Sequence, residues 1–190
     1  MAFNIDDFKS GFQGGTRQNR FFVEGVIPFS NGNLSKFHIT TTQIPPMSTV
    51  ATEYNYFGRK VFYPGEKQFS TWSFIVLDDT DTNGNLWKKF QSWQNSINNH
   101  TTNNSSIINA QQTYKASDWK IRHLNLNGSE EEVDILKTFT LQGCWPKTIE
   151  PIAFNMGNVN SLNRFSVVFV YDYIEIDGLS SSKIPTQPNN

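Results

Sequence analysis

The sequence predicts a β-rich α+β fold, an antiparallel barrel-like or sandwich-like subunit with one capping helix. Aromatic residues make up 14% of the chain, and its 16 Phe and 5 Trp residues belong to the types that favour a pleated, half-buried surface. Short apolar runs are separated by Gly, Pro and Asn turn signals, as in a sheet protein. One convincing helical pattern, over residues 86–97, interrupts them.

The length of 190 residues suits one domain, and no internal repeat or linker divides the chain. We expect a single domain over residues 1–177 and a flexible tail over residues 178–190. The net charge of −1 and the scattered Lys and Arg residues indicate no basic patch for gripping nucleic acid. Without a signal-peptide pattern or a window of ~20 apolar residues, we expect a soluble protein made in a cytoplasm, with no membrane insertion.

The first third of the chain predicts a short helix and two strands. Residues 5–12 favour a helix, and residues 21–27 and 36–42 are expected strands around an Asn-Gly hairpin turn at residues 31–32. Pro45 and Pro46 should end the second strand, because neither can donate to a ladder.

Residues 47–63 do not fit a globular core. They are rich in aromatics and are interrupted by Gly58-Arg59-Lys60, so we expect an extended arm or long loop with exposed aromatic side chains. The aromatic members are Tyr54, Tyr56, Phe57, Phe62 and Tyr63. Pro64-Gly65 should then turn the chain into a strand over residues 68–77. Alternation puts Trp72, Phe74 and Val76 on one face of that strand, and Thr71 and Ser73 on the other.

The helix predicted over residues 86–97 is amphipathic and about three turns long. Capping candidates lie at residues 81–85, and its Trp and Phe residues form a stripe that suits the covering of a sheet. The Asn-rich residues 98–113 that follow predict a polar surface loop.

The last third of the chain predicts only strands. Trp119 and Ile121 share one phase while Leu124 and Leu126 share the other, which indicates a bulge at residues 122–123. A turn at residues 127–128 leads to an alternating strand with Val133, Ile135, Phe139 and Leu141 on its apolar face. Thr138, Thr140 and Gln142 lie on its polar face. After Trp145-Pro146 we expect a loop to residue 163, and then one strand over residues 164–176, about 40 Å long.

No pattern in the sequence indicates catalysis. The three histidines, His38, His100 and His123, lie far apart in the chain without metal-pair spacing. No nucleophile elbow, phosphate-binding loop or dinucleotide fingerprint is present. Asp78, Asp79 and Asp81 lack the glycine and glutamate of a calcium loop, and the single Cys144 suits a buried structural thiol. We therefore expect a protein that is not an enzyme and has no cofactor or metal.

Long strands indicate self-assembly, because they leave edges that invite pairing with other chains. A ring of subunits that closes into one barrel removes such edges, and the aromatic arm would supply a second contact. The alternative is a monomeric β-sandwich with a loop, such as a carbohydrate-binding module that uses Trp72, Trp119 or Tyr63 as a stacking platform. Alternation places both tryptophans in the core, which counts against that alternative.

A series of segments resembles the tail tube proteins of contractile-tailed, T-even-type bacteriophages. The series begins with residues 17–23 (RQNRFFV) and continues with residues 44–46 (IPP), 58–61 (GRKV) and 64–72 (PGEKQFSTW). It ends with residues 90–94 (FQSWQ), 141–146 (LQGCWP) and the strand that leads to residues 171–173 (YDY). The order and spacing agree over about residues 15–175. The loop at residues 98–113 and the tail after residue 176 depart from the family.

The resemblance implies a virion protein that assembles in the host cytoplasm. Six copies would form a ring with one continuous β-barrel, and stacked rings would form a hollow tube that conducts double-stranded DNA during ejection. Its partners would be further copies of itself, the tail sheath protein, the baseplate or tube initiator, and the tape measure protein.

The resemblance also suggests roles for particular residues. The arm at residues 47–63 would reach the adjacent ring, with Tyr54, Tyr56, Phe57, Arg59 and Lys60 as stacking residues. A lumen that grips DNA weakly should be polar with few cations. Thr71, Ser73, Thr138, Thr140 and Gln142 are therefore candidates for its lining, and the alternative is that this polar face points toward the sheath. A baseplate tube initiator, a terminator, or the tube protein of an injection or secretion particle remain alternatives.

Overall fold

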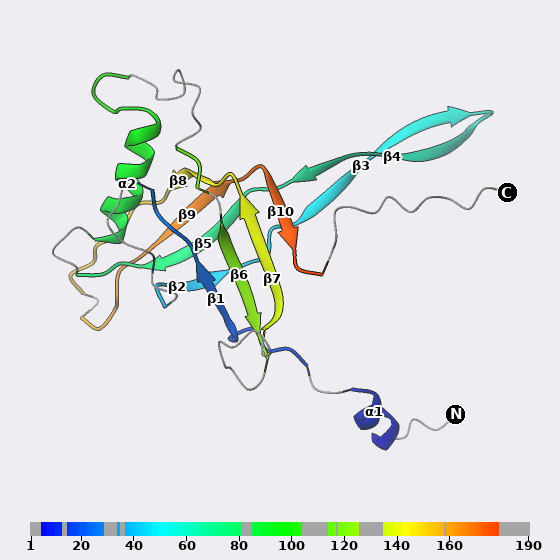
Figure 1. The fold of residues 1–190 in the computed structure, drawn as a ribbon, viewed down its shortest axis with the longest axis horizontal. Coiled ribbons are helices and arrows are strands. Elements are labelled where there is room, and N and C mark those ends of the chain that lie inside the picture. Colours follow the sequence, from blue (N-terminus) through cyan, green and yellow to red (C-terminus); the bar gives the residue numbers. More distant parts are fainter. Residues whose placement is uncertain are drawn as a thin grey trace.

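The computed structural model describes residues 5–12, 15–28, 34, 37–80, 85–103, 114–116, 118–125, 135–157 and 159–178. Two four-stranded antiparallel sheets pack against each other, and a two-stranded arm extends from them (Figure 1). Sheet I has the strand order β1-β6-β7-β10, and sheet II has the order β2-β5-β9-β8. The arm consists of β3 and β4. This architecture confirms the predicted β-rich fold class.

The elements have the following bounds. Sheet I contains β1 (Phe21–Glu24), β6 (Trp119–Leu124), β7 (Ile135–Gln142) and β10 (Tyr173–Ile176). Sheet II contains β2 (Ile39–Thr42), β5 (Trp72–Leu77), β8 (Trp145–Ile149) and β9 (Arg164–Val170). The arm contains β3 (Met47–Tyr56) and β4 (Arg59–Phe69), and the helices are α1 (Ile5–Gly11) and α2 (Leu86–Ile97).

An aromatic core joins the two sheets. Trp119 of sheet I lies 5.9 Å from Trp72 and 4.9 Å from Phe169 of sheet II, measured between ring centroids. All three side chains are fully buried. Aromatic pairs at these separations contribute about 0.5–1.5 kcal/mol each beyond the area that they bury. The predicted core role of Trp72 and Trp119 is confirmed, so neither indole is available as a carbohydrate-stacking platform.

Helix α2 covers the open side of this core, as its sequence pattern predicts. Phe90 and Trp93 are fully buried, and Trp93 stacks on Trp119 with ring centroids 6.5 Å apart. Asn85 caps the helix by accepting a hydrogen bond from the Lys88 N–H at 3.0 Å, which satisfies one of the first-turn donors. Helix α1 is also present, and it lies away from the two sheets (Figure 1).

The single strand predicted over residues 164–176 is wrong, because the chain bends at Tyr171-Asp172 and changes sheets. β9 belongs to sheet II and β10 to sheet I. The chain also changes sheets at Gly143-Cys144, where it passes from β7 of sheet I to β8 of sheet II. The two crossings lie side by side, since Asp172 N–H donates to Gln142 O at 2.9 Å. In packed sheets, a strand that bends in this way contributes its first part to one sheet and its second part to the other. The 40 Å strand used to argue for surplus sheet therefore does not exist.

Two other strand predictions are also wrong. The strand predicted over residues 68–77 is broken at residues 70–71, so Phe69 ends the arm and Trp72 begins β5. Pro64-Gly65 lies inside β4 rather than in a turn. The register changes between the pairs Thr49↔Lys67 and Ala51↔Pro64. Over this interval β3 advances by two residues and β4 by three, so β4 contains one extra residue. Pro64 and Gly65 thus lie beside a bulge, where a strand tolerates proline.

The loop predicted from residue 147 to residue 163 begins later, because β8 continues to Ile149. The bulge predicted at residues 122–123 is near its true place but on the wrong strand. Pairing steps from His123↔Lys137 to Leu124↔Ile135, so the extra residue, Leu136, belongs to β7. The turns at residues 31–32 and 127–128, residues 104–113 of the polar loop, and residues 179–190 of the tail lie outside the described residues.

Candidate functional site

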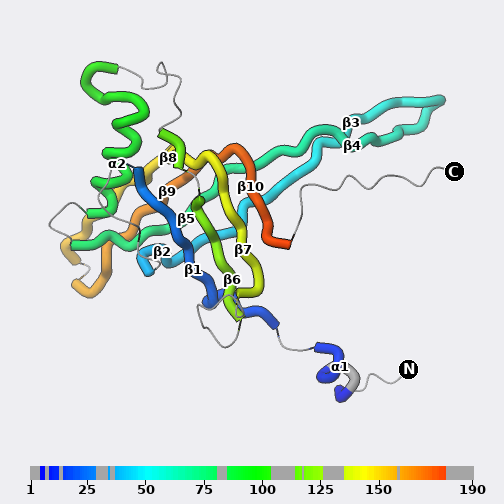
Figure 2. Tube along the Cα trace, in the orientation of Figure 1, coloured from blue at the N-terminus to red at the C-terminus, as the bar shows by residue number. Residues whose placement is uncertain are grey.

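The arm is a hairpin that leaves the body of the protein (Figure 2). Each residue of β3 and every residue of β4 up to Gln68 is exposed, and ten residues of extended β3 span about 34 Å. Phe57 and Gly58 close the hairpin with φ angles of 46° and 75°, as a two-residue type I′ turn requires. The predicted arm is confirmed as a paired hairpin, and the alternative of a long loop is wrong.

The candidate stacking residues divide between the two faces of the arm. Tyr54 pairs with Val61, and Tyr56 pairs with Arg59. Because pairs two residues apart share a face, Tyr54, Tyr56 and Arg59 lie together with Tyr63. Lys60 lies on the opposite face, where its Nζ forms an ion pair with Glu53 at 2.8 Å. The first face has no core beneath it, and Tyr54, Tyr56 and Tyr63 remain about 60% exposed (61%, 60% and 59%).

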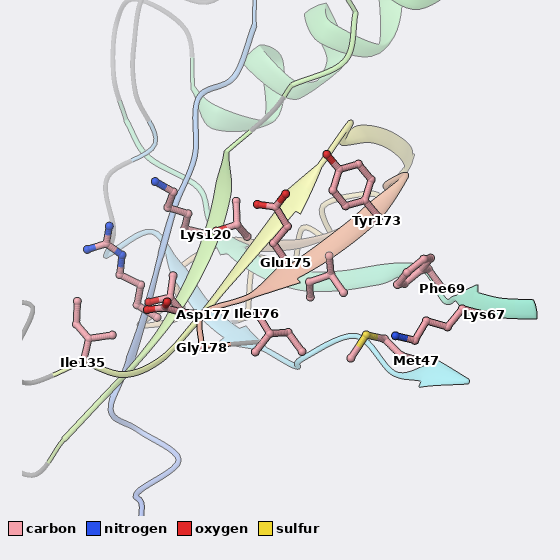
Figure 3. A pocket seen from close by; sticks show the side chains of 14 residues that line it. Met47, Lys67, Phe69, Lys120, Ile135, Tyr173, Glu175, Ile176, Asp177 and Gly178 are labelled. Atoms are coloured by element: carbon pink, nitrogen blue, oxygen red, sulfur yellow. The ribbon is translucent and has the colours of Figure 1, made fainter. Parts of the chain in front are cut away.

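An open groove of about 1330 Å³ lies between the base of the arm and β10 (Figure 3). Met47, Lys67 and Phe69 line it from the arm, while Ile174 and Ile176 line it from β10. The groove is larger than the roughly 300–1,000 Å³ typical of small-molecule pockets. Lys120, Arg122, Thr138 and Thr140 of β6 and β7 also line it, so it is an open hollow over the outward face of sheet I and not an enclosed small-molecule pocket.

Thr138, Thr140 and Gln142 lie on the face of sheet I that points away from the core. They alternate with buried Phe139 and Leu141 along β7. The same face carries two cations, Lys120 and Arg122, and one carboxylate, Glu24, that lies near both. Lys120 lies opposite Glu24, and Arg122 Nη2 forms an ion pair with Glu24 Oε2 at 3.3 Å.

Thr71 and Ser73 do not join this group. Ser73 lies on β5 of sheet II, between buried Trp72 and Phe74, so it points away from the core on the other side of the sandwich. Thr71 lies in the break between β4 and β5 and is exposed. Ser73 therefore lies on the opposite side of the sandwich from Thr138, Thr140 and Gln142, and a single lumen can be lined by only one of these two faces.

An ion pair holds the corner where two segments of the chain, residues 143–144 and 171–172, cross between the sheets. Lys115 Nζ lies 2.7 Å from Asp172 Oδ2 and 2.9 Å from Asp172 Oδ1. Cys144 is fully buried beside this pair, as predicted. Burial, and secondly the Asp172 carboxylate, raise the pKa of the Cys144 thiol from 9.0 to about 12. This thiol is structural, since a reactive cysteine needs a lowered pKa.

The sequence reasoning missed an apolar loop between β8 and β9. Phe154, Met156, Val159 and Leu162 are between 71% and 104% exposed. The loop lies at the end of the long axis opposite the tip of the arm (Figure 1). The clustering of apolar residues between Asn and Gly residues was the available signal. Exposed apolar groups of this kind mark interaction surfaces.

Within the described ranges, no group of three or more His, Cys, Asp and Glu side chains could hold a metal ion. Across the same ranges, no helix has the length and apolar character needed to cross a membrane. The arm and the apolar loop carry several of the exposed large apolar side chains among the described residues.

A family model described as "Phage tail tube protein" matches residues 16–176. The chain belongs to the phage tail tube protein family. A curated member, the "Tail tube protein" of Serratia phage KSP90, is 25% identical over 109 residues. That alignment covers 57% of this chain and 56% of the relative, so the chain spans about half the length of the curated relative that it matches. The family resemblance inferred from the sequence segments is confirmed.

Solved structures of injection particles share the fold of this tail tube family member. A chain of the extended PVC sheath-tube complex, from an extracellular contractile injection system, matches with a TM-score of 0.60 and 15% identity, covering 94% of this chain and 100% of its own. The anti-feeding prophage tube-terminating cap matches with a TM-score of 0.61 and 17% identity, covering 87% and 92%. The PVC sheath/tube terminator matches with a TM-score of 0.60 and 17% identity, covering 86% of this chain and 97% of its own. At these identities the likeness establishes the fold.

Proposed function

We propose that this chain is the repeating subunit of the inner tube of a contractile phage tail. Six copies form a ring, rings stack into a hollow tube, and double-stranded DNA passes through the tube during ejection. The observation that carries this proposal is the family match over residues 16–176. It is a structural role and requires no catalysis.

The outer face of sheet I suits the wall of a DNA conduit. Thr138, Thr140 and Gln142 present neutral polar groups. The nearby cations are opposed by Glu24, through the ion pair with Arg122 and the position opposite Lys120. Each phosphate contact with a free cation would release counterions and favour retention of the DNA. A mostly neutral wall whose cations lie beside a carboxylate would therefore lower the friction on the passing duplex.

The arm and the apolar loop suit the stacking of rings. They lie at opposite ends of the molecule (Figure 1), so a head-to-tail contact between copies would repeat without limit along one direction. We place the tyrosine face of the arm against the loop of residues 150–163 in the adjacent ring. Burial of exposed aromatic and aliphatic side chains would supply the free energy of stacking.

The proposed partners follow from the tube role. The outside of the tube would contact the tail sheath protein, a pairing found in the similar sheath-tube complex. Assembly would begin on the baseplate or tube initiator in the host cytoplasm, around the tape measure protein, and the product would reside in the virion. These assignments rest on membership of the family.

A second candidate function is the tube or terminator protein of a contractile injection particle. The similarity to two terminator structures favours it. A terminator ends a tube, so it should form single rings that do not stack further. The curated sequence relative is a phage tail tube protein, which favours the repeating subunit.

Negative-stain electron microscopy of the purified protein at low and high concentration tests the proposal. Six-fold rings that stack into hollow tubes as concentration rises are the expected result. Single rings at every concentration would favour the terminator. A uniform monomer that also ignores added baseplate seeds would overturn both functions.

A further inference from the structure

The outward face of sheet II is apolar at its centre. Its two central strands, β5 and β9, alternate buried residues with half-buried ones that point away from the core. Four of these outward positions hold aliphatic side chains, Ile75 and Leu77 on β5 and Val168 and Val170 on β9. Among the described residues, the core cluster and the side chains packed against it do not include these four. They form a separate apolar surface, the outer patch.

Sheet I provides the matched comparison for this patch. Its central strands, β6 and β7, hold Lys120, Arg122, Thr138 and Thr140 at outward positions. An antiparallel sheet with one face in water is polar on that face, whereas strands that are buried on both faces are apolar throughout. The outer patch therefore indicates that another protein covers the outward face of sheet II.

Strand pairing surrounds the outer patch with hydroxyl groups. Val168 of β9 lies opposite Ser73 of β5. On the flanking strands, exposed Thr41 of β2 lies opposite Ile75, and exposed Thr148 of β8 lies opposite Val168. An apolar centre within a polar rim is the usual composition of a protein–protein interface.

Arg164 gives the outer patch a positive charge at one end. It is exposed and lies opposite Leu77. A guanidinium group makes its strongest hydrogen bonds with a carboxylate. The patch therefore suits a partner with aliphatic side chains and an acidic residue beside them.

We propose that the outer patch is the docking surface for the tail sheath protein, and that it holds the sheath mainly through apolar contact. The sheath segment presents aliphatic side chains to Ile75, Leu77, Val168 and Val170, and a carboxylate to Arg164. The inference rests on the proposed tube function, and it identifies the face and the chemistry of one partner contact.

The place of the patch in the fold favours the sheath over a second copy of this chain. The arm and the apolar loop, which we place in ring stacking, lie at the two ends of the long axis (Figure 1). β5 and β9 are the central strands of sheet II, so a contact along a sheet edge leaves their outward face uncovered. Because we place the outward face of sheet I at the channel, the outward face of sheet II lies on the outside of the tube.

Thiol labelling tests which molecule covers the outer patch. Ser166 lies opposite Ile75, so Ser166→Cys puts a thiol within the patch. In bare tubes this thiol should react with a small maleimide, and the reaction should be lost in tubes assembled with the tail sheath protein of the same phage. Thr140→Cys on sheet I is the matched control, and its labelling should be the same with and without the sheath. Buried Cys144 should not contribute.

Removal of the aliphatic groups tests the chemistry of the contact. Ile75→Thr/Val168→Thr/Val170→Thr keeps β-branched side chains, which suit a strand, but adds hydroxyl groups to the patch. This variant should form normal tubes that no longer carry the sheath in co-sedimentation. Lys88→Ser, at an exposed position of α2, is the control and should keep the sheath. Added salt screens exposed ion pairs, so the wild-type complex should withstand it.

Several outcomes would overturn the docking surface. These are equal binding of the sheath by the threonine variant, and equal labelling of Ser166→Cys with and without the sheath. Protection of Ser166→Cys in bare tubes would assign the patch to a second copy of this chain. Loss of the sheath from Lys88→Ser alone, or its release by salt, would contradict an apolar contact.

The same samples separate the inference from the proposed function. Absence of tubes from the unmodified protein would overturn the proposed function itself, whereas tubes with an uncovered patch would overturn only the docking surface. If the threonine variant forms no tubes, the labelling of Ser166→Cys decides alone.

Discussion

At the scale of single residues, Gly143 is a position with little freedom to change. Its φ is +69°, a conformation that costs other residues free energy. A side chain there would also collide with the Asp172 carboxylate, which holds the corner through Lys115. Two separate penalties therefore meet at one residue.

Gly143→Ala should lower the free energy of unfolding by about 2–4 kcal/mol, through backbone strain and displacement of Asp172. Gly58→Ala is the matched control, since Gly58 has a φ of +75° and no atom near its missing side chain. It should cost only about 1–2 kcal/mol, the cost of the left-handed backbone alone. Urea unfolding followed by tryptophan fluorescence measures both. Equal losses would contradict a steric role for Asp172.

Cys144 should resist thiol reagents until the protein unfolds, because its thiol is buried and its pKa is raised to about 12. The folded state keeps the proton to higher pH than the unfolded state does. The stability from this thiol is therefore complete below pH 9 and is lost as pH rises from about 9 to 12.

Reaction with a chromogenic disulfide at pH 8 should be slow for native protein and fast in denaturant. A comparison of unfolding free energies between wild type and Cys144→Ala across pH 8–11 isolates the contribution of the thiol. Rapid labelling of the native protein would show that the corner opens.

At the scale of elements, the arm contributes little to the stability of the monomer, because its residues are exposed and β3 and β4 pair mainly with each other. Tyr54→Ser/Tyr56→Ser/Tyr63→Ser should therefore change the free energy of unfolding by less than about 1 kcal/mol. The variant should form rings that fail to stack, since the tyrosine face is removed.

Phe154→Ser/Met156→Ser, on the apolar loop, should give the same rings without tubes. Phe62→Ser is the control, because Phe62 is 61% exposed but lies on the other face of the arm. Sedimentation and microscopy separate rings from tubes. Normal tubes from the tyrosine variant, or loss of tubes from the Phe62 variant alone, would contradict the proposed stacking face.

At the scale of the whole molecule, the assignment of the lumen to sheet I predicts which thiols an assembled tube protects. Thr140→Cys should react with a small maleimide but not with one attached to a protein too large for the lumen. Ser73→Cys should react with the large reagent unless a neighbouring subunit covers it. In dissociated protein both positions should react with both reagents.

Mass spectrometry of tubes and of dissociated subunits gives the labelled fraction at each position. Protection of Ser73→Cys together with labelling of Thr140→Cys by the large reagent would assign the lumen to sheet II.

The sequence by itself determined the β-rich class, the capping helix, the aromatic core and the family. These follow from local periodicity: Trp72 and Trp119 alternate with polar neighbours, and the apolar residues of α2 recur at helical spacing. The exposed arm was also predictable, because residues 47–63 have aromatics without the pattern of a core.

Only the tertiary structure decided which strands share a sheet. Alternation continues through residues 164–176, yet the chain changes sheets at Asp172, where Lys115 pairs with the carboxylate and the missing side chain of Gly143 leaves room for it. Likewise, Ser73 and Thr138 have the same local pattern but lie on opposite faces of the sandwich. Periodicity indicates that a side chain points away from the core. Contacts between residues far apart in the chain decide on which of the two outer faces of the sandwich it lies.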